Sequence, residues 1–329
     1  MVNIRKLNYF DKSKIKELSA FLKEEDENSF ISILSNGLPG RLHYYLPLKY
    51  KVLNESFLLT DNNKILGLIT VGTFNGNPFK INISQLCFIE NAYEVAGQLV
   101  DFIISQYGAM GAHTFYVLIS EKYNELAQMF INNCGFRQTS YEQIWQVPKI
   151  SFRKERNITY RRFRKSDVKE VADIYNDSLF AHFKPTLLRE PSEFCEPIFS
   201  GLKNKNEYRY VIEEPSISRI ISYFKISTAD NENYTVDFNY SNGYDLDFDT
   251  ILYFATREIL KRTRKYNLFI KMKNYINTNK AQKEYFKERG FVCVSTKNLF
   301  VKDFFKVAKE YSEQEKFAVM GGWHNSPSF

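Results

Sequence analysis

The segment Asn124-Glu-Leu-Ala-Gln-Met-Phe-Ile-Asn-Asn-Cys-Gly-Phe136 decides the fold of this chain, because its pattern returns later in the sequence. The second copy is Asn279-Lys-Ala-Gln-Lys-Glu-Tyr-Phe-Lys-Glu-Arg-Gly-Phe291. In both copies the asparagine precedes the glycine by 11 residues, and the copies lie 155 residues apart. A repeat of this length has the size of a domain rather than of a solenoid unit. The sequence therefore predicts two similar domains in tandem.

The two halves show the same order of predicted elements. Each begins with a short strand and an amphipathic helix, and Ser166 stands where the cap of the second of these helices is expected. A hairpin, a third strand, a helix and a buried strand follow, and each half ends with the repeated helix and a last strand pair. Before the repeated helix, these elements are predicted at 4–7, 15–22, 56–71, 80–88, 96–107 and 114–119, and at 158–163, 168–175, 208–226, 234–240, 249–266 and 268–272. We therefore expect domains at 1–150 and 158–303, a linker at 151–157, and a C-terminal helix and tail at 304–329.

Composition excludes several classes of protein. With 329 residues, of which 44% are hydrophobic and 16% aromatic, the chain can build two cores and is not a disordered polymer. It contains no apolar run of the roughly 18 residues that a membrane span needs, and its first residues lack the apolar stretch of a signal peptide. The four cysteines are widely spaced, and Cys134 and Cys293 are expected to be buried thiols. These features predict a cytoplasmic protein with no membrane partner.

The element order and the ending Asn-x-x-Ala-x-x-Phe-x-x-x-x-Gly-Phe resemble the GNAT superfamily of acyltransferases. The resemblance implies an α/β (α+β) fold of two tandem GNAT-like domains, each a mixed, mostly antiparallel central sheet flanked by helices. In that family the fourth and fifth strands diverge, and the pantetheine of acyl-CoA lies between them. Its pyrophosphate lies at the N-terminus of the next helix, where free N–H groups and the helix dipole favour an anion. The implied cofactor is acetyl-CoA or another acyl-CoA.

The resemblance also implies a cofactor site in the first half. The family's phosphate loop corresponds to residues 92–97, where only Gly97 matches the family pattern. Ala92 stands in place of the cation, Val95 stands in place of the first glycine, and Glu94 adds a negative charge beside the expected phosphates. The expected cofactor-binding residues are Phe88, Ile89, Val95, Ala96, Gly97 and Asn124. Two alternatives stay open. Gly97 could simply allow close packing of a helix on a strand, and Asn124, like Asn279 in the second half, could be a helix cap.

The corresponding segment of the second half, 245–250, has no glycine and carries Asp245, Asp247 and Asp249. Like charges so close together oppose a phosphate, so we expect that this half does not bind CoA in the usual way. The alternatives are a divalent cation bridging the carboxylates or a solvated strand face with Leu246 and Phe248 inward.

Two residues are candidates for proton transfer in the first half. In the family a tyrosine four residues before the Gly of the Gly-Phe pair often protonates the leaving thiolate, but here Ile131 and Phe286 occupy that position. Tyr123 is a neighbouring hydroxyl, and Glu90 is the candidate general base at the end of the fourth strand. The alternative for Glu90 is a surface carboxylate without a role.

The charge of the chain is uneven. Of its net +7, residues 1–150 contribute nothing, and residues 257–289 carry 11 Lys and Arg against three Glu. With interleaved aromatic residues, this basic stretch could bind CoA's 3′-phosphate, RNA or an acidic protein. It could equally be an exposed face balanced by neighbouring acidic residues.

Together these features predict an acyl-CoA-dependent N-acyltransferase that acetylates a small-molecule or protein amine, with the first domain as the cofactor binder. The alternative is a catalytically silent module that binds a protein or RNA partner through the basic stretch or the C-terminal tail.

Overall fold

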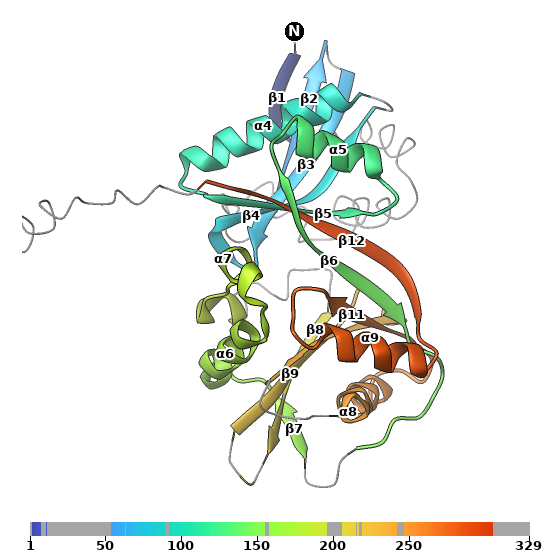
Figure 1. Cartoon of the computed structure of the whole chain (residues 1–329). Helices are drawn as coiled ribbons and strands as arrows, with labels where there is room; N and C mark the ends of the chain where they lie inside the picture. The colour runs from blue at the N-terminus through green and yellow to red at the C-terminus, as the bar shows by residue number, and fades with distance from the viewer. Residues whose placement is uncertain are drawn as a thin grey trace, which may run out of the picture.

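The computed structural model of the chain describes residues 2–7, 11, 54–62, 64–89, 92–154, 158–195, 206–214, 216, 219–241 and 247–304. These residues form one twelve-stranded sheet with the order β1-β2-β3-β4-β5-β12-β6-β11-β10-β9-β8-β7 (Figure 1). Neighbouring strands are antiparallel except β4 with β5 and β10 with β11, which are parallel. The predicted mixed, mostly antiparallel sheet is therefore confirmed.

Each half contributes six strands to this sheet. Those of the first half are β1 (Val2–Lys6), β2 (Glu55–Asp61), β3 (Lys64–Phe74), β4 (Asn77–Phe88), β5 (Thr114–Ser120) and β6 (Arg137–Gln146). Those of the second half are β7 (Thr159–Arg162), β8 (Asn206–Glu214), β9 (Arg219–Thr228), β10 (Asn233–Tyr240), β11 (Asn267–Lys273) and β12 (Val292–Asp303). The central strands β3 and β5 are apolar along nearly their whole length because side chains on both of their faces are buried.

Helices cover both faces of the sheet (Figure 1). On one face, α4 (Tyr93–Ala109) and α5 (Asn124–Asn132) cover the first half, and α8 (Phe248–Leu260) and α9 (Asn279–Glu288) cover the second. On the opposite face lie α6 (Val168–Ser178) and α7 (Lys184–Leu187), with short 3₁₀ turns at Lys165–Asp167, Ala181–Phe183 and Pro191–Phe194. Adjacent residues of β5 show the two faces, because Phe115 packs in the core beneath α4 and Tyr116 in the core beneath α6.

The last strands of the two halves are exchanged. We predicted that each half ends in a strand pair of its own, and this prediction is wrong. Instead, β12 lies between β5 and β6 of the first half, while β6 lies between β12 and β11 of the second (Figure 1). Each half thus supplies one strand to the other, and the sheet continues without a break.

The glycines of the repeated segment end the repeated helices. Gly135 follows α5 with φ of 68°, and Gly290 follows α9 with φ of 72°, a left-handed conformation in which glycine carries no steric cost. The next residue then turns back onto its helix, since the amides of Phe136 and Phe291 donate to carbonyls of α5 and α9. Both phenylalanine side chains are buried. The motif that predicted the repeat is therefore a helix C-cap with an apolar anchor.

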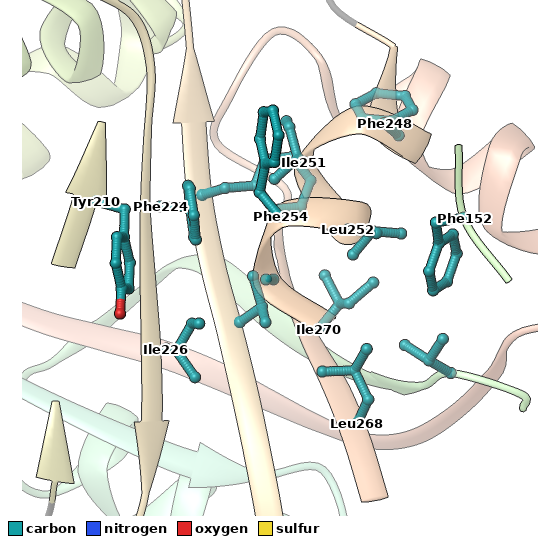
Figure 2. Close-up of a cluster of buried hydrophobic side chains, with 14 of the residues drawn as sticks. Phe152, Tyr210, Phe224, Ile226, Phe248, Ile251, Leu252, Phe254, Leu268 and Ile270 are labelled. Carbon is teal, nitrogen blue, oxygen red and sulfur yellow. The ribbon is translucent and has the colours of Figure 1, made fainter. Parts of the chain in front are cut away.

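Each half has its own apolar core beneath its helix pair. The core of the second half joins α8 to β8, β9 and β11, and Figure 2 shows Phe254 of α8 close to Phe224 of β9. The strand exchange reaches into both cores. Trp145 of β6 packs in the second core, with its ring 5.6 Å from that of Phe286, and Phe300 of β12 packs in the first.

Some local predictions differ from the structure or lie outside it. The cap residue of α6 is Asp167 rather than Ser166, because a 3₁₀ turn at Lys165–Asp167 precedes the helix, and Asp167 forms no capping bond through its side chain. Cys134 is buried as expected, but Cys293 is exposed near the start of β12. The helix predicted at 15–22 and the helix and tail after 304 lie outside the described residues. No helix among those described is long and apolar enough to span a membrane.

Candidate functional site

The parallel strands β4 and β5 diverge in the first half. They pair only over Lys80–Ile83 and Thr114–Val117, after which β4 stays on β3 as far as Phe88 and β5 follows β12. A β-bulge at Ser84, opposite the step from Thr70 to Val71, marks the point of divergence. Beyond it, β4 is only partly covered, and among Ser84–Phe88 only Cys87 is buried. The first half therefore has a partly exposed strand end.

The N-terminus of α4 faces this end of β4 without a side-chain cap. Its cap residue is Ala92, which cannot accept a hydrogen bond through its side chain. The Val95 and Ala96 amides donate to the Ala92 carbonyl at 3.0 and 3.4 Å, so they are engaged within the turn. The amides of Tyr93 and Glu94 form no backbone hydrogen bond to any residue that the structure describes. They are the free donors that an anion would meet here.

Gly97 does not serve helix packing, which answers one of the alternatives left open above. A Cβ built at Gly97 would meet no atom within 4 Å. The glycine that lets α4 approach the sheet is instead Gly67 of β3, where a Cβ would lie 2.8 Å from Val95 and 3.0 Å from Leu99. Gly97 therefore leaves space on the surface of α4 beside its first turn.

The end of β4 offers backbone donors toward the gap. The Ile89 amide donates to the carbonyl of Leu66 at 3.0 Å and is engaged in the sheet. Because the bonds of an antiparallel ladder alternate, the N–H groups of Leu86 and Phe88 point the other way, to the side from which β5 has diverged. Of the two predicted backbone positions, Phe88 thus has the orientation that a donor in the gap requires.

A hydrogen bond that the sequence analysis missed joins the N-termini of α4 and α5. The Tyr93 hydroxyl donates to Glu125 Oε2 at 2.5 Å, and this bond raises the pKa of Tyr93 above its usual value. Tyr93 also packs edge-on against Phe88, with ring centroids 5.4 Å apart. Tyr93 and Glu125 lie 32 positions apart in sequence, so their hydrogen bond follows only from the packing of the two helices.

Tyr123 and Asn124 lie at the start of α5. Tyr123 is its cap residue, is partly buried, and makes no capping bond through its side chain. Asn124 is exposed in the first turn, so it is not the helix cap that the alternative required. Glu90 lies outside the described residues, and its role stays a prediction. Apolar residues occupy the position at which the sequence resemblance implies a tyrosine proton donor. Ile131 is half-buried and Phe286 is fully buried.

The corresponding gap of the second half is closed by side chains. β10 pairs with β11 only as far as Asp237 and Lys271, and β10 then ends in three buried residues. The Lys273 ammonium, 3% exposed, lies 2.5 Å from Asp237 Oδ1 and 3.5 Å from Asn239 Oδ1. Burial lowers the pKa of Lys273, and its charge helps hold the pKa of Asp237 at about 2 against the opposing effect of burial. The β10 end has no counterpart of the Ser84 bulge.

The helix that follows β10 is capped by its own carboxylate. Asp247 accepts a hydrogen bond from the Asp249 amide at 3.0 Å, at the place where an anionic ligand would lie. Asp249 is in turn bound by Arg289 at 2.7 Å and by the Tyr285 hydroxyl. Phe248 is buried as one alternative required, whereas Asp245 and Leu246 lie outside the described residues. No group of three or more His, Cys, Asp or Glu side chains suited to a metal ion occurs in the described part of the chain.

The second copy of the repeated asparagine is also engaged internally. Asn279 Nδ2 donates to the carbonyl of Lys273 at 2.9 Å and so fixes the end of β11. Its counterpart Asn124 forms no such bond to a described residue. The two halves therefore differ at each compared feature, namely the strand end, the helix N-terminus and the asparagine.

The basic stretch 257–289 does not form one surface. Arg257, Lys261 and Arg262 lie at the C-terminal end of α8. Lys271 and Lys273 lie in the β10–β11 region, where they pair with Glu142 and Asp237. The remaining described bases of the stretch lie in the turn after α8 and on or next to α9.

Comparisons with known proteins support the fold but not a closer kinship. No family model matches the sequence, and no curated protein matches it significantly. In structure, the chain is similar to a tandem GNAT protein from the clavulanic acid biosynthesis pathway, with a TM-score of 0.59 and 8% identity, over 94% of this chain and 100% of that one. It is also similar to a GCN5-related N-acetyltransferase from Sphaerobacter thermophilus, with a TM-score of 0.60 and 10% identity, over 92% and 95% of the two chains.

A third similar structure is a putative acetyltransferase from Pyrococcus horikoshii, with a TM-score of 0.55 and 10% identity, over 92% and 90% of the two chains. Identities this low establish architecture alone. Because these matches span nearly the whole of both chains, and because both halves place a helix between two parallel strands, the chain has the tandem GNAT fold.

Proposed function

We propose that the protein is an acyl-CoA-dependent N-acyltransferase, which transfers an acetyl group from acetyl-CoA to an amine. The first half binds the cofactor, and the second half is degenerate. The observation that carries this proposal is the asymmetry between the halves. The first has a partly exposed strand end and an uncapped helix N-terminus, whereas the second has a buried strand end and a helix capped by Asp247.

The residues at the first gap fit the group that they are proposed to hold. The free amides of Tyr93 and Glu94 suit the pyrophosphate, and the open space at Gly97 lets the ligand approach the helix backbone. Phe88 N–H is oriented to donate to the thioester carbonyl oxygen as negative charge develops on it. Asn124, which is exposed in the first turn of α5, is proposed to donate to the pantetheine arm. Ile89, Val95 and Ala96 contribute shape rather than hydrogen bonds, since their amides are engaged.

The reaction requires two proton transfers. The amine nitrogen attacks the carbonyl carbon and loses a proton, while the carbon–sulfur bond breaks and the thiolate gains one. Glu90 is proposed as the base, and Tyr123 as the acid. The bonded pair Tyr93 and Glu125 lies at the same helix N-termini and is a second acid–base pair for these steps. The acceptor is a small-molecule or protein amine.

Calorimetric titration with acetyl-CoA tests the proposal. The wild type is expected to bind, and Gly97→Trp is expected to abolish binding because its ring fills the open space beside the first turn. Gly108→Trp is the matched control, because Gly108 lies on the same helix, is exposed and also has no atom within 4 Å of its Cβ. A wild type that binds no acetyl-CoA, or a Gly97→Trp variant that binds as well as Gly108→Trp, would remove the proposed site.

A catalytically silent binding module is the second candidate. It is favoured by the apolar residues Ile131 and Phe286, which stand where the family has its proton donor. Release of free thiol from acetyl-CoA in the presence of a panel of amines separates the two. Binding without thiol release for any amine would favour the silent module, and its partner would be sought at the basic stretch or the C-terminal tail.

A further inference from the structure

A cavity of about 610 Å³ lies at the C-terminal end of α8, the end opposite to the helix N-terminus discussed above. Edge strand β7 and strand β8 form one side of it, and α8 with the following turn forms the other. Its lining comprises Tyr160, Arg161, Arg162, Tyr210, Arg257, Glu258, Lys261 and Arg262. Five of these eight side chains are cationic, and one is acidic.

The aromatic members give this cavity a fixed wall. Tyr160 stacks on Phe254 with ring centroids 4.4 Å apart, and Tyr210 stacks on Phe224 at 5.1 Å. Both partners belong to the core beneath α8 (Figure 2). The polar groups at the cavity are therefore held on a packed surface.

The single carboxylate of the cavity is saturated by its neighbours. Glu258 accepts hydrogen bonds from the hydroxyls of Tyr160 at 2.7 Å and Tyr210 at 2.6 Å. It also pairs with Lys261, and Arg262 bonds both its backbone carbonyl and the Tyr210 oxygen. Burial and the bond to Glu258 raise the pKa of Tyr210 to about 12. Glu258 therefore orients the cations around it and has little capacity for others.

Positive charge remains after every pair is counted. Arg161 is bound by two further carboxylates, Asp167 at 2.7 Å and Glu213 at 2.6 Å. Even with these two included, the five cations exceed the three carboxylates. Arg162 and Arg257 form no ion pair and no side-chain hydrogen bond with any residue that the structure describes. The dipole at the C-terminus of α8 amounts to about half a charge, which is too small to balance two guanidinium groups.

We propose that this cavity binds a phosphate-bearing small molecule, with Arg162 and Arg257 as its principal contacts. A guanidinium presents two parallel N–H donors that match phosphate oxygens, and a phosphate carries nearly the two charges that the cavity lacks. The cavity is wide open to solvent, and its volume is large enough to admit a phosphate-bearing small molecule. A compact ligand fits better than a long polyanion, because Lys271, Lys273 and Arg289 of the same basic stretch are paired elsewhere.

Isothermal titration of the full chain with inorganic pyrophosphate tests this site. The double variant Arg162→Gln, Arg257→Gln is expected to lower the affinity at least tenfold. The control variant Lys280→Gln, Lys283→Gln removes two charges from α9 and is expected to change it less than twofold. Both titrations are repeated in the Gly97→Trp background, so that pyrophosphate bound at the first-half helix N-terminus does not contribute. The cavity and the proposed acyl-CoA site are therefore tested independently.

Three outcomes would overturn the proposal. The first is a wild type that does not bind pyrophosphate, and the second is an equal loss of affinity in both double variants, which would indicate an effect of net charge alone. The third is binding that disappears with Gly97→Trp but survives the loss of both arginines. A single-stranded RNA that binds tightly and loses affinity equally in both double variants would instead point to a diffuse basic surface.

Discussion

Replacing Phe300 by alanine should destabilise the first half, although the residue belongs to the last strand of the second. Phe300 is 1% exposed and lies in the core beneath α4 and α5, among residues such as Phe130 and Phe136. Truncating a buried phenylalanine to alanine typically removes about 3–5 kcal/mol, through lost burial and the cavity left behind. That is a large part of the roughly 5–15 kcal/mol that stabilises a typical folded domain. We expect a loss in this range.

Native-state hydrogen exchange shows which elements lose stability in the variant. In Phe300→Ala, the amides of α4 and β5 should lose protection by at least as much as those of β12 itself. Val294→Ala is the matched control, since Val294 lies on the same strand but is 50% exposed, and it should change stability by no more than about 0.5 kcal/mol. Unchanged protection in α4 and β5, with loss confined to α8 and β9, would refute the idea that the first core depends on the exchanged strand.

Three further predictions concern single sites. Gly97→Ala should raise the free energy of unfolding in urea by about 0.5–1 kcal/mol, because alanine favours a helix and the position is open. Gly67→Ala should lower the free energy of unfolding, because the new Cβ would clash with α4, and a change of the same sign in both variants would contradict this. Although burial raises the pKa of Glu258, bonds from Lys261 and the two tyrosines hold it at about 2, below its ordinary 4.5, so its stabilising contribution is present above pH 4.5 and is lost as pH falls toward 2. Between these pH values the wild type should lose up to about 3 kcal/mol of unfolding free energy, measured by urea titration, that Glu258→Gln does not lose. A variant whose unfolding free energy falls with pH as steeply as that of the wild type would count against the assignment. Finally, Asn279→Ala should lower the free energy of unfolding, measured by thermal denaturation, by about 1 kcal/mol through the lost bond to β11. Asn124→Ala should leave the free energy of unfolding unchanged but weaken acetyl-CoA binding. The reverse pattern would argue against the roles given to the two halves.

The sequence predicted the elements well because their signals are local. The hairpin predicted at 56–71 is confirmed as β2 and β3, with Asn62 at positive φ in the turn. The predicted strand at 114–119 and the helix at 96–107 appear with ends shifted by at most three residues. The repeated glycines and phenylalanines predicted both helix ends, since a left-handed glycine and a buried anchor follow from backbone and side-chain chemistry alone.

The strand exchange could not be predicted in this way. The residues of β6 and of β12 would form a strand equally well beside a strand of their own half or beside one of the other half. A strand's own sequence therefore does not determine which strand it pairs with. The prediction of the candidate site was incomplete for a similar reason. Residues 92–97 located the helix N-terminus, but which amides are free depends on the turn at Ala92. The bond between Tyr93 and Glu125 depends on the packing of two helices.

The exchange of last strands also bears on how this protein is made. A ribosome delivers the first half long before β12, because roughly 145 residues separate Gln146 from Val292. At typical rates of synthesis this interval lasts about 7–30 s. Throughout it, β5 lacks the β12 partner that it has in the folded protein, and the first core lacks Phe300. The first half therefore cannot complete its sheet and its core until β12 has been synthesised.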